Sequence, residues 1–204
     1  MIGIKLDKNK KISITKDIVE IDVPKNIYIP LCSGNNKNVT TLVKKDDYVC
    51  KGQIIAKTKG ELSIPIFSSV SGTVIDFVEK VDNSGTYVKC VSIENDYKER
   101  EEIKREKTND ISSYAQEEFI EKIHSCGVIG MGGSGFPTYI KYKTDKDIKT
   151  LIINAVECEP YITADYMLIK TKIEEILECC DAITEIFNIE ECYIAIKVGN
   201  DEIK

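Results

Sequence analysis

The sequence predicts an α+β chain of two domains, an all-β domain followed by an α/β domain. Three observations support this prediction. The N-terminal half carries short runs rich in valine, isoleucine and threonine, separated by turn residues at short, even intervals. The C-terminal part combines apolar strand-like runs with apolar residues at helical spacing. Between them lies an almost wholly charged stretch without an apolar face. We therefore expect a β domain at residues 1–94, a linker at 95–110 and an α/β domain at 111–204.

Length and charge limit the classes of partner. A chain of 204 residues can form two small domains that each bury a core. The formal net charge is −6 and the basic residues are scattered, which argues against nucleic acid and anionic membranes as partners. No apolar run has the length of a signal peptide core or a membrane span. We therefore expect a cytoplasmic protein, or one peripheral to the cytoplasmic face of a membrane.

The eight cysteines include no C-x-x-C pair, which argues against a zinc ribbon or a ferredoxin-type cluster within this chain. Because no secretion signal precedes them, reduced thiols are expected rather than disulfides. A metal site assembled from distant cysteines stays open as an alternative. The single histidine, His124, falls near the end of a predicted helix and is expected to be a surface or helix-terminal residue.

The N-terminal domain is predicted to be a small β-sandwich. Residues 10–21 alternate between polar and apolar residues, which predicts an edge strand. Glycine and aspartate turn signals then separate a series of further short strands. These strands are expected at residues 24–31, 39–43, 48–49, 53–56, 62–64, 73–77 and 87–93.

The C-terminal domain is predicted to alternate helices and parallel strands. Ser113 with Gln116 three residues later resembles a capping box, which predicts a helix over 113–125 that Gly127 ends. The pattern then predicts a short helix, a buried strand, a long helix or broken helix pair, and a closing strand. These elements are expected at residues 138–143, 151–154, 164–187 and 192–198.

A glycine-rich stretch is the strongest functional signal. Four glycines fall within the six positions 130–135, which lets the backbone approach a ligand closely. Lys141 follows, an amide ends the predicted strand at 151–154, and two acids come shortly after it. Backbone N–H groups with a nearby lysine are suited to a phosphate-bearing cofactor. A helix rather than a strand precedes the glycines, so the order of elements differs from a standard dinucleotide-binding fingerprint.

Residues 43–56, with Ile64-Pro65 and residues 70–74, resemble a biotinyl/lipoyl-type barrel-sandwich hybrid. In carriers of that family a lysine on an exposed hairpin takes the prosthetic group, and Lys59 falls near that position. Its surroundings, Thr58-Lys59-Gly60-Glu61, lack the usual carrier motif. A solvated turn lysine and a carrier lysine are therefore both open readings of Lys59.

Residues 127–141 and 151–165 closely resemble the C subunit of the Rnf electron-transport complex, RnfC. They are equally similar to the related proline-reductase-associated electron-transfer protein, PrdC. A more distant similarity is to the NADH-oxidising flavoprotein subunit of respiratory complex I. With the barrel-sandwich block, the resemblance covers nearly the whole chain. It implies an α/β domain like that of the complex I subunit.

The resemblance implies a site for flavin mononucleotide (FMN) that accepts hydride from NADH. The glycines would bring backbone N–H groups to the FMN phosphate and ribityl chain, and the lysine would add positive charge. The amide would hydrogen-bond the flavin ring edge, and the two acids would line the ring or the nicotinamide side. The implied cofactor-binding residues are Gly130, Gly132, Gly133, Gly135, Lys141, Asn154, Glu157 and Glu159.

The chain departs from the RnfC pattern at its end. Members of that family continue into a β-grasp region and a ferredoxin-type module with 4Fe-4S clusters, whereas this sequence stops at Lys204. The resemblance is therefore to a truncated N-terminal portion, which would pass electrons to clusters absent from this chain and associate with other redox-complex subunits. Locally, Ala155 stands where a glycine is usual and Tyr166 where an acid is common. A non-catalytic docking or scaffold piece is the alternative function.

Overall fold

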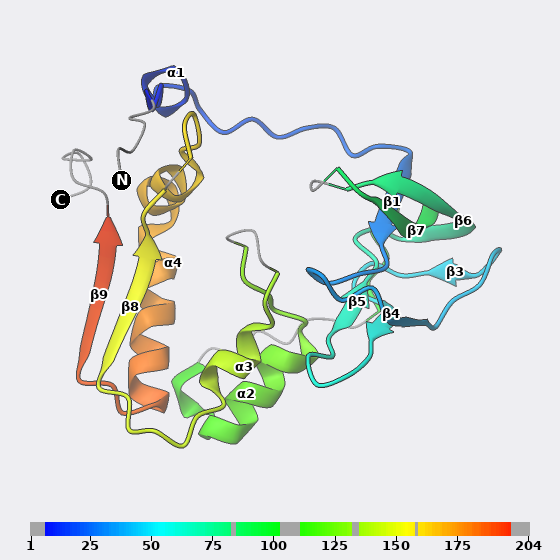
Figure 1. Ribbon diagram of the computed structural model, residues 1–204. Coiled ribbons are helices and arrows are strands. Elements are labelled where there is room, and N and C mark those ends of the chain that lie inside the picture. The colour runs from blue at the N-terminus through cyan, green and yellow to red at the C-terminus, as the bar shows by residue number, and fades with distance from the viewer. Residues whose placement is uncertain (1–6, 83–84, 103–110, 132–134, 158, 197–204) are drawn as a thin grey trace, which may run out of the picture. The chain divides into compact units, whose positions relative to one another are not determined.

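The computed structural model describes residues 7–82, 85–102, 111–131, 135–157 and 159–196. The chain forms two compact units, each assembled from segments that are distant in sequence (Figure 1). We call the first the α/β unit; it comprises residues 1–21, 109–116 and 146–204. The second, the sandwich unit, comprises residues 22–108 and 117–145.

The sandwich unit contains two antiparallel sheets. The larger sheet has the strand order β1-β7-β6-β3, and the smaller one has the order β2-β4-β5. The larger sheet is built from β1 (Asn26–Pro30), β3 (Tyr48–Val49), β6 (Gly72–Val81) and β7 (Tyr87–Asn95). The smaller one is built from β2 (Val39–Thr41), β4 (Ile54–Thr58) and β5 (Pro65–Phe67). The all-β barrel-sandwich hybrid expected from the sequence is confirmed.

Aliphatic side chains from both sheets form the core of the sandwich unit. Val49, Ile55, Val74, Val91 and Ile93 are fully buried in one cluster. Burial of each such side chain stabilises the fold by roughly 1.5–3 kcal/mol. These residues come from β3, β4, β6 and β7, so the apolar alternation of the sequence faces inward, as the strand pattern predicted.

Two predicted strands are wrong. Within residues 10–21 the structure forms a single helical turn, α1 (Lys11–Ile14), instead of an edge strand. Ile12 is exposed, and the Ser13 hydroxyl donates to the Lys10 and Tyr161 carbonyls. Because no neighbouring strand pairs with this segment in the described sheets, alternation alone does not make it a strand.

The strand expected at residues 62–64 is also displaced. Ser63 closes a turn by donating its N–H to the Gly60 carbonyl, and β5 begins only at Pro65. Proline is tolerated there because β5 lies at the edge of its sheet.

Two helices follow the sandwich in sequence. A 3-10 turn, η1 (Ile111–Ser113), precedes α2 (Gln116–Ser125), and α3 (Thr138–Tyr142) comes after the glycine-rich stretch. The helix predicted over 113–125 therefore begins three residues later than expected. The Gln116 side chain donates to the Ile186 carbonyl at 3.0 Å, so its partner lies far away in the sequence. The short helix predicted at 138–143 is confirmed.

The α/β unit pairs β8 (Thr150–Ala155) with β9 (Glu191–Ile196) in parallel register, and α4 (Ala164–Ile186) connects them and packs against both. The predicted parallel strand pair is confirmed. The strand expected to be buried alternates instead between half-buried and exposed residues, with Ile152 63% exposed. Lys172 has non-helical backbone angles, so α4 is a broken helix pair. A helix of the length and apolarity that a bilayer demands does not occur in the described part of the chain.

Candidate functional site

The glycine-rich stretch forms a loop whose two ends pair with each other. Ile129 and Pro137 form an antiparallel bridge. On either side of it, the Gly130 N–H donates to the Phe136 carbonyl at 2.8 Å, and the Thr138 N–H donates to the Val128 carbonyl at 2.9 Å. The two ends of the loop are therefore fixed to each other, directly before α3.

Two glycines fix this loop to the β-sandwich. Gly127 and Gly135 have φ angles of +64° and +60°, in the left-handed region that favours glycine. A Cβ on Gly127 would lie 2.8 Å from the Phe67 ring, and one on Gly135 would lie 2.9 Å from the Gly34 nitrogen. The Ser33 hydroxyl also lies within 3.4 Å of the Gly135 carbonyl. These two glycines therefore serve packing.

Gly130 has a different environment. A Cβ built on it would lie 3.8 Å from the Lys141 ammonium nitrogen and 3.6 Å from the Phe136 oxygen. The ammonium group, carried by the exposed side chain of α3, therefore lies next to the backbone of the glycine loop. Because its own N–H bonds to the Phe136 carbonyl, Gly130 offers space instead of a donor, and this space next to a cation suits a phosphate group. Gly132 and Gly133, the other two predicted glycines, lie outside the described residues.

Helix α3 is anchored by its aromatic residue. The Tyr139 hydroxyl donates to the Glu61 carbonyl at 3.0 Å, and its ring lies 4.2 Å from the His124 ring, centroid to centroid. A ring nitrogen of His124 lies 2.9 Å from the Ser63 carbonyl oxygen. Burial, and to a lesser extent the carboxylate of Glu121, raise the pKa of Tyr139. His124 is helix-terminal as expected, and it helps to fix the helix that carries Lys141.

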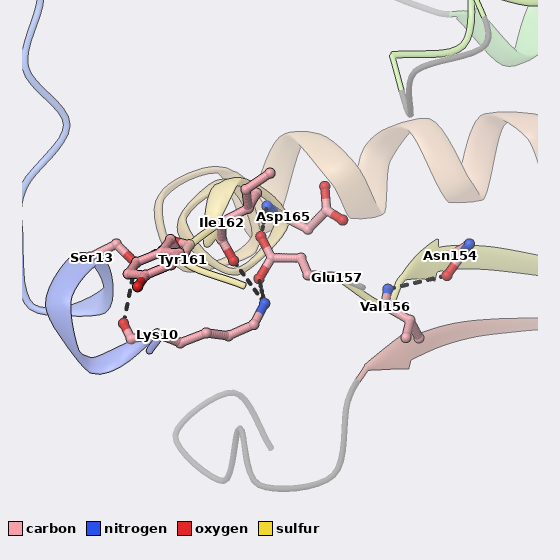
Figure 2. Close-up of polar contacts among 8 residues, drawn as sticks. All are labelled: Lys10, Ser13, Asn154, Val156, Glu157, Tyr161, Ile162 and Asp165. Atoms are coloured by element: carbon pink, nitrogen blue, oxygen red, sulfur yellow. Dashed lines mark hydrogen bonds and ion pairs between the residues drawn. The ribbon is translucent and has the colours of Figure 1, made fainter. Parts of the chain in front are cut away.

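The second group of predicted site residues lies at the end of β8 and just after it. Asn154 is exposed at the end of the strand, and its side-chain oxygen accepts the Val156 N–H at 3.1 Å. This hydrogen bond fixes which way the amide faces. Its oxygen contacts the Val156 N–H, and its NH2 group points away from that contact (Figure 2). Glu159 is also exposed. Both side chains are accessible at the carboxyl end of the strand.

Glu157 has the opposite environment, because its side chain is only 5% exposed. One carboxylate oxygen lies 3.0 Å from the Lys10 ammonium, and the other accepts the Asp165 N–H at 2.8 Å (Figure 2). Asp165 is the second residue of α4, and Thr163 at the N-cap position makes no side-chain cap. Glu157 therefore satisfies a backbone donor at the start of α4, where the helix dipole also favours a negative charge.

The carboxyl group of Asp165 responds to this environment. Burial is the largest cause that raises its pKa, followed by the charge of Glu157, while the Lys10 ammonium opposes the shift and Glu159 adds to it. The start of α4 is therefore rich in negative charge, and Lys10 partly compensates it.

Lys10 is a residue that our sequence analysis missed. Its ammonium donates to Glu157 and, at 2.7 Å, to the Ile162 carbonyl. It lies 147 positions from Glu157, in a segment with no motif of its own. No local pattern could have identified it.

Comparison with known proteins covers both parts of the chain. Residues 1–98 match the RnfC barrel sandwich hybrid domain, and residues 123–203 match the Nuo51 FMN-binding domain. The chain is therefore RnfC-like. The order of the two domains agrees with the resemblance seen in the sequence, whereas the likeness to PrdC stays a prediction.

Several curated relatives of this RnfC-like chain are, by name, C subunits of oxidoreductase complexes. It is 29% identical over 197 residues to the C subunit of the proton-translocating ferredoxin:NAD(+) oxidoreductase complex of Clostridium ljungdahlii, covering 96% of this chain and 43% of the relative. It is 32% identical to the C subunit of the ion-translocating oxidoreductase complex of Pasteurella multocida, covering 98% of this chain and 24% of the relative. The corresponding protein of Rhodobacter capsulatus is also 32% identical, with 96% and 38% covered. The chain thus spans less than half the length of each of these relatives.

The predicted site residues of the RnfC-like chain divide between the two units. Gly130, Gly135 and Lys141 belong to the sandwich unit, and the structure brings the first and last of these together. Asn154, Glu157 and Glu159 belong to the α/β unit. The assembly of both groups into one cofactor site stays a prediction.

Two other candidates can be placed. Lys59 is exposed in a turn, where its N–H donates to the Asn38 carbonyl and its own carbonyl accepts from Asn36. These contacts are equally compatible with a solvated lysine and with a carrier lysine. Among the described residues, no three histidine, cysteine or acidic side chains gather in a way that could hold a metal ion.

Proposed function

We propose that this RnfC-like chain binds FMN, that the bound flavin accepts hydride from NADH, and that the electrons pass on to iron–sulfur clusters outside this chain. The observation that carries the proposal is the Lys141 ammonium beside Gly130. It lies within a segment that matches the Nuo51 FMN-binding domain. A cation beside bare backbone fits the phosphate of FMN, which is the charged part of that cofactor.

In this proposal the residues divide the binding task. Lys141 and the backbone of Gly132, Gly133 and Gly135 hold the phosphate and the ribityl chain, and Gly130, whose own N–H bonds to the Phe136 carbonyl, leaves room beside Lys141. Asn154 donates its amide NH2 to the ring edge, and the exposed acid after β8, Glu159, borders the ring or the nicotinamide. The flavin, when bound, supplies the redox chemistry, while the protein orients it and sets the charge around it.

The proposed partners are other subunits of a redox complex. This rests on the names of the relatives, which are subunits of ferredoxin:NAD(+) or ion-translocating oxidoreductase complexes. We place the chain at the periphery of such a complex, on the cytoplasmic face, where NADH is available.

Binding of FMN to the purified chain tests the proposal. Titration should quench flavin fluorescence with saturation, and Lys141→Met should raise the Kd for FMN by about 10- to 100-fold, because a charge-assisted phosphate contact is lost. Lys122→Met is the matched control, since Lys122 is an exposed lysine on α2 of the same unit. Riboflavin lacks the phosphate, so its weaker binding should be the same for wild type and Lys141→Met.

Two results would contradict the proposal. One is a folded chain that binds neither FMN nor riboflavin. The other is a Lys141→Met variant that binds FMN as tightly as the Lys122→Met control. A folded chain without flavin that still associates stably with redox subunits would favour a docking or scaffold role instead.

A further inference from the structure

The N-terminal segment Lys8–Ser13 holds the loop at residues 159–163 at several points. The Tyr161 N–H donates to the Lys8 carbonyl at 2.8 Å, and the Tyr161 carbonyl accepts from the Ser13 hydroxyl at 2.6 Å. The Asn9 amide donates to the Tyr161 hydroxyl at 3.0 Å. Both segments belong to the α/β unit, and Figure 2 shows Lys10, just before α1, and Ser13, on α1, reaching the loop.

Tyr161 has a backbone conformation that this contact supports. Its φ angle is +65°, which is uncommon for a bulky residue and is kept only where the surroundings hold it. Its N–H, carbonyl and hydroxyl all bond to the N-terminal segment. Because three groups of this one residue bond to the N-terminal segment, that segment holds the loop in one shape, although it lies about 150 residues away in the sequence.

The ion pair of Lys10 with Glu157 completes the contact. Their side chains are 16% and 5% exposed, so the pair is largely shielded from water. Both carboxylate oxygens of Glu157 are engaged, one with Lys10 and the other with the Asp165 N–H. With a side chain only 5% exposed, Glu157 has little surface left for a cofactor.

We infer that Lys10 is a positioning residue for the candidate flavin site. It holds Glu157 in place under the loop, so that Asn154 and Glu159 are the side chains presented to a cofactor. The carboxylate of Glu157 then serves the start of α4 instead of contacting the ligand. The part of this inference that concerns a cofactor rests on the proposed function, whereas the part that concerns Lys10, Glu157 and the loop does not.

Hydrogen exchange of the protein without flavin tests the first part. In Lys10→Met the buried carboxylate of Glu157 loses its cation, so the Asp165 amide should exchange about tenfold faster or more, and the Tm should fall by about 5 °C. Lys11→Met is the matched control, because Lys11 is the exposed neighbour on the same helical turn, and it should change neither value.

A second variant shows whether the effect passes through Glu157. In Lys10→Met/Glu157→Gln the buried charge is removed, while the glutamine oxygen can still accept the Asp165 N–H. This double variant should recover most of the lost protection relative to Lys10→Met. A general loss of packing in the N-terminal segment would not be rescued in this way.

Flavin titrations test the second part. Lys10→Met should weaken FMN and riboflavin binding by the same factor, on the order of tenfold, because the residue supports the ring side of the site and not the phosphate. Glu159→Gln should shift the absorption spectrum of the bound flavin while leaving amide exchange at Asp165 unchanged. Glu157→Gln should leave the spectrum unchanged.

The outcomes separate this inference from the proposed function. Unchanged exchange at Asp165 in Lys10→Met, or no recovery in the double variant, overturns the positioning role whether or not FMN binds. Wild type that binds no flavin overturns the proposed function and leaves the exchange result standing. A spectral shift with Glu157→Gln but not with Glu159→Gln overturns the assignment of Glu159 as the side chain that faces the cofactor.

Discussion

At the scale of single residues, the glycines of the loop have different tasks. Gly127 and Gly135 have positive φ angles, and an added Cβ would meet neighbouring atoms at 2.8–2.9 Å. Gly130 has only ordinary contact distances of 3.6–4.0 Å around its missing Cβ, and one of these contacts is the Lys141 ammonium. The first two glycines are therefore required by packing, and the third keeps space open beside a cation.

Alanine substitutions should separate these tasks. Gly135→Ala should destabilise the chain by at least about 1–2 kcal/mol, because it combines left-handed strain with a clash against backbone. Gly130→Ala should leave the midpoint of urea unfolding nearly unchanged but raise the Kd for FMN, since its methyl group fills space next to Lys141. Equal stability losses in the two variants would contradict this division.

Asp96 gives a prediction about acid. Hydrogen bonds from the Ser71 hydroxyl, the Lys98 N–H and the Tyr48 hydroxyl lower the pKa of Asp96 to about 2, from an ordinary value of 3.8. A carboxyl group with a lowered folded pKa stabilises the fold above its unfolded pKa, and this stabilisation is lost as the pH falls through the folded pKa.

The Tm difference between wild type and Asp96→Asn should therefore be largest above about pH 5 and should shrink as the pH approaches about 2. Asp46→Asn is a suitable control, because Asp46 lies in the same unit with a left-handed backbone that asparagine also tolerates. A gap that stays constant, or that widens toward low pH, would show that the hydrogen bonds of Asp96 are not the cause.

At the scale of elements, α3 depends on its anchor. The Tyr139 ring is buried, and its hydroxyl donates to the Glu61 carbonyl at 3.0 Å. Tyr139→Phe keeps the ring but leaves a carbonyl short of a donor, which should cost about 1 kcal/mol and lower the Tm by a few degrees. Tyr87→Phe, at a residue 69% exposed, should have no measurable effect. A neutral Tyr139→Phe would mean that the ring alone anchors α3.

The elements that the sequence predicted well are those bounded by turn chemistry. β3 and β4 lie on either side of the Lys51-Gly52 turn, and Gly52 has a φ angle of +81°, so the break in the pattern has a conformational cause. The segment at residues 10–21 has the alternation of a strand but no sheet partner among the described strands. Pairing partners are distant in sequence, and alternation carries no information about them.

The candidate site, too, was predictable from the sequence only where its contacts are local. The neighbourhood of Gly130 and Lys141 follows from a short loop and the helix after it, so local spacing sufficed. The burial of Glu157 does not follow from its own surroundings, because its cation comes from Lys10. Contacts across such separations depend on how the chain folds back, which a single sequence does not encode in any local pattern.

At the scale of the whole molecule, the two packing units do not follow the order of the chain. Residues 7–21 fall within the match to the RnfC barrel sandwich hybrid domain, yet they pack in the α/β unit. Residues 117–145, with the glycine loop, pack in the sandwich unit. Segments from distant parts of the sequence therefore stabilise each unit, so a ligand held by residues of both units would couple their stabilities.

Thermal unfolding with and without FMN tests this coupling. A ligand that binds only the folded chain adds about 2.7 kcal/mol at a concentration of 100 Kd, which for a chain of this size corresponds to a rise in Tm of about 5–10 °C. If Lys141 and the site residues at the end of β8 and after it hold the same FMN, both units should gain that stability and unfold in one transition. Circular dichroism, with the helix and strand signals recorded together, measures this transition. In Lys141→Met the same FMN concentration should give a smaller rise. A rise confined to one of two separate transitions would show that FMN contacts only one unit, and no rise at saturating FMN would contradict flavin binding altogether.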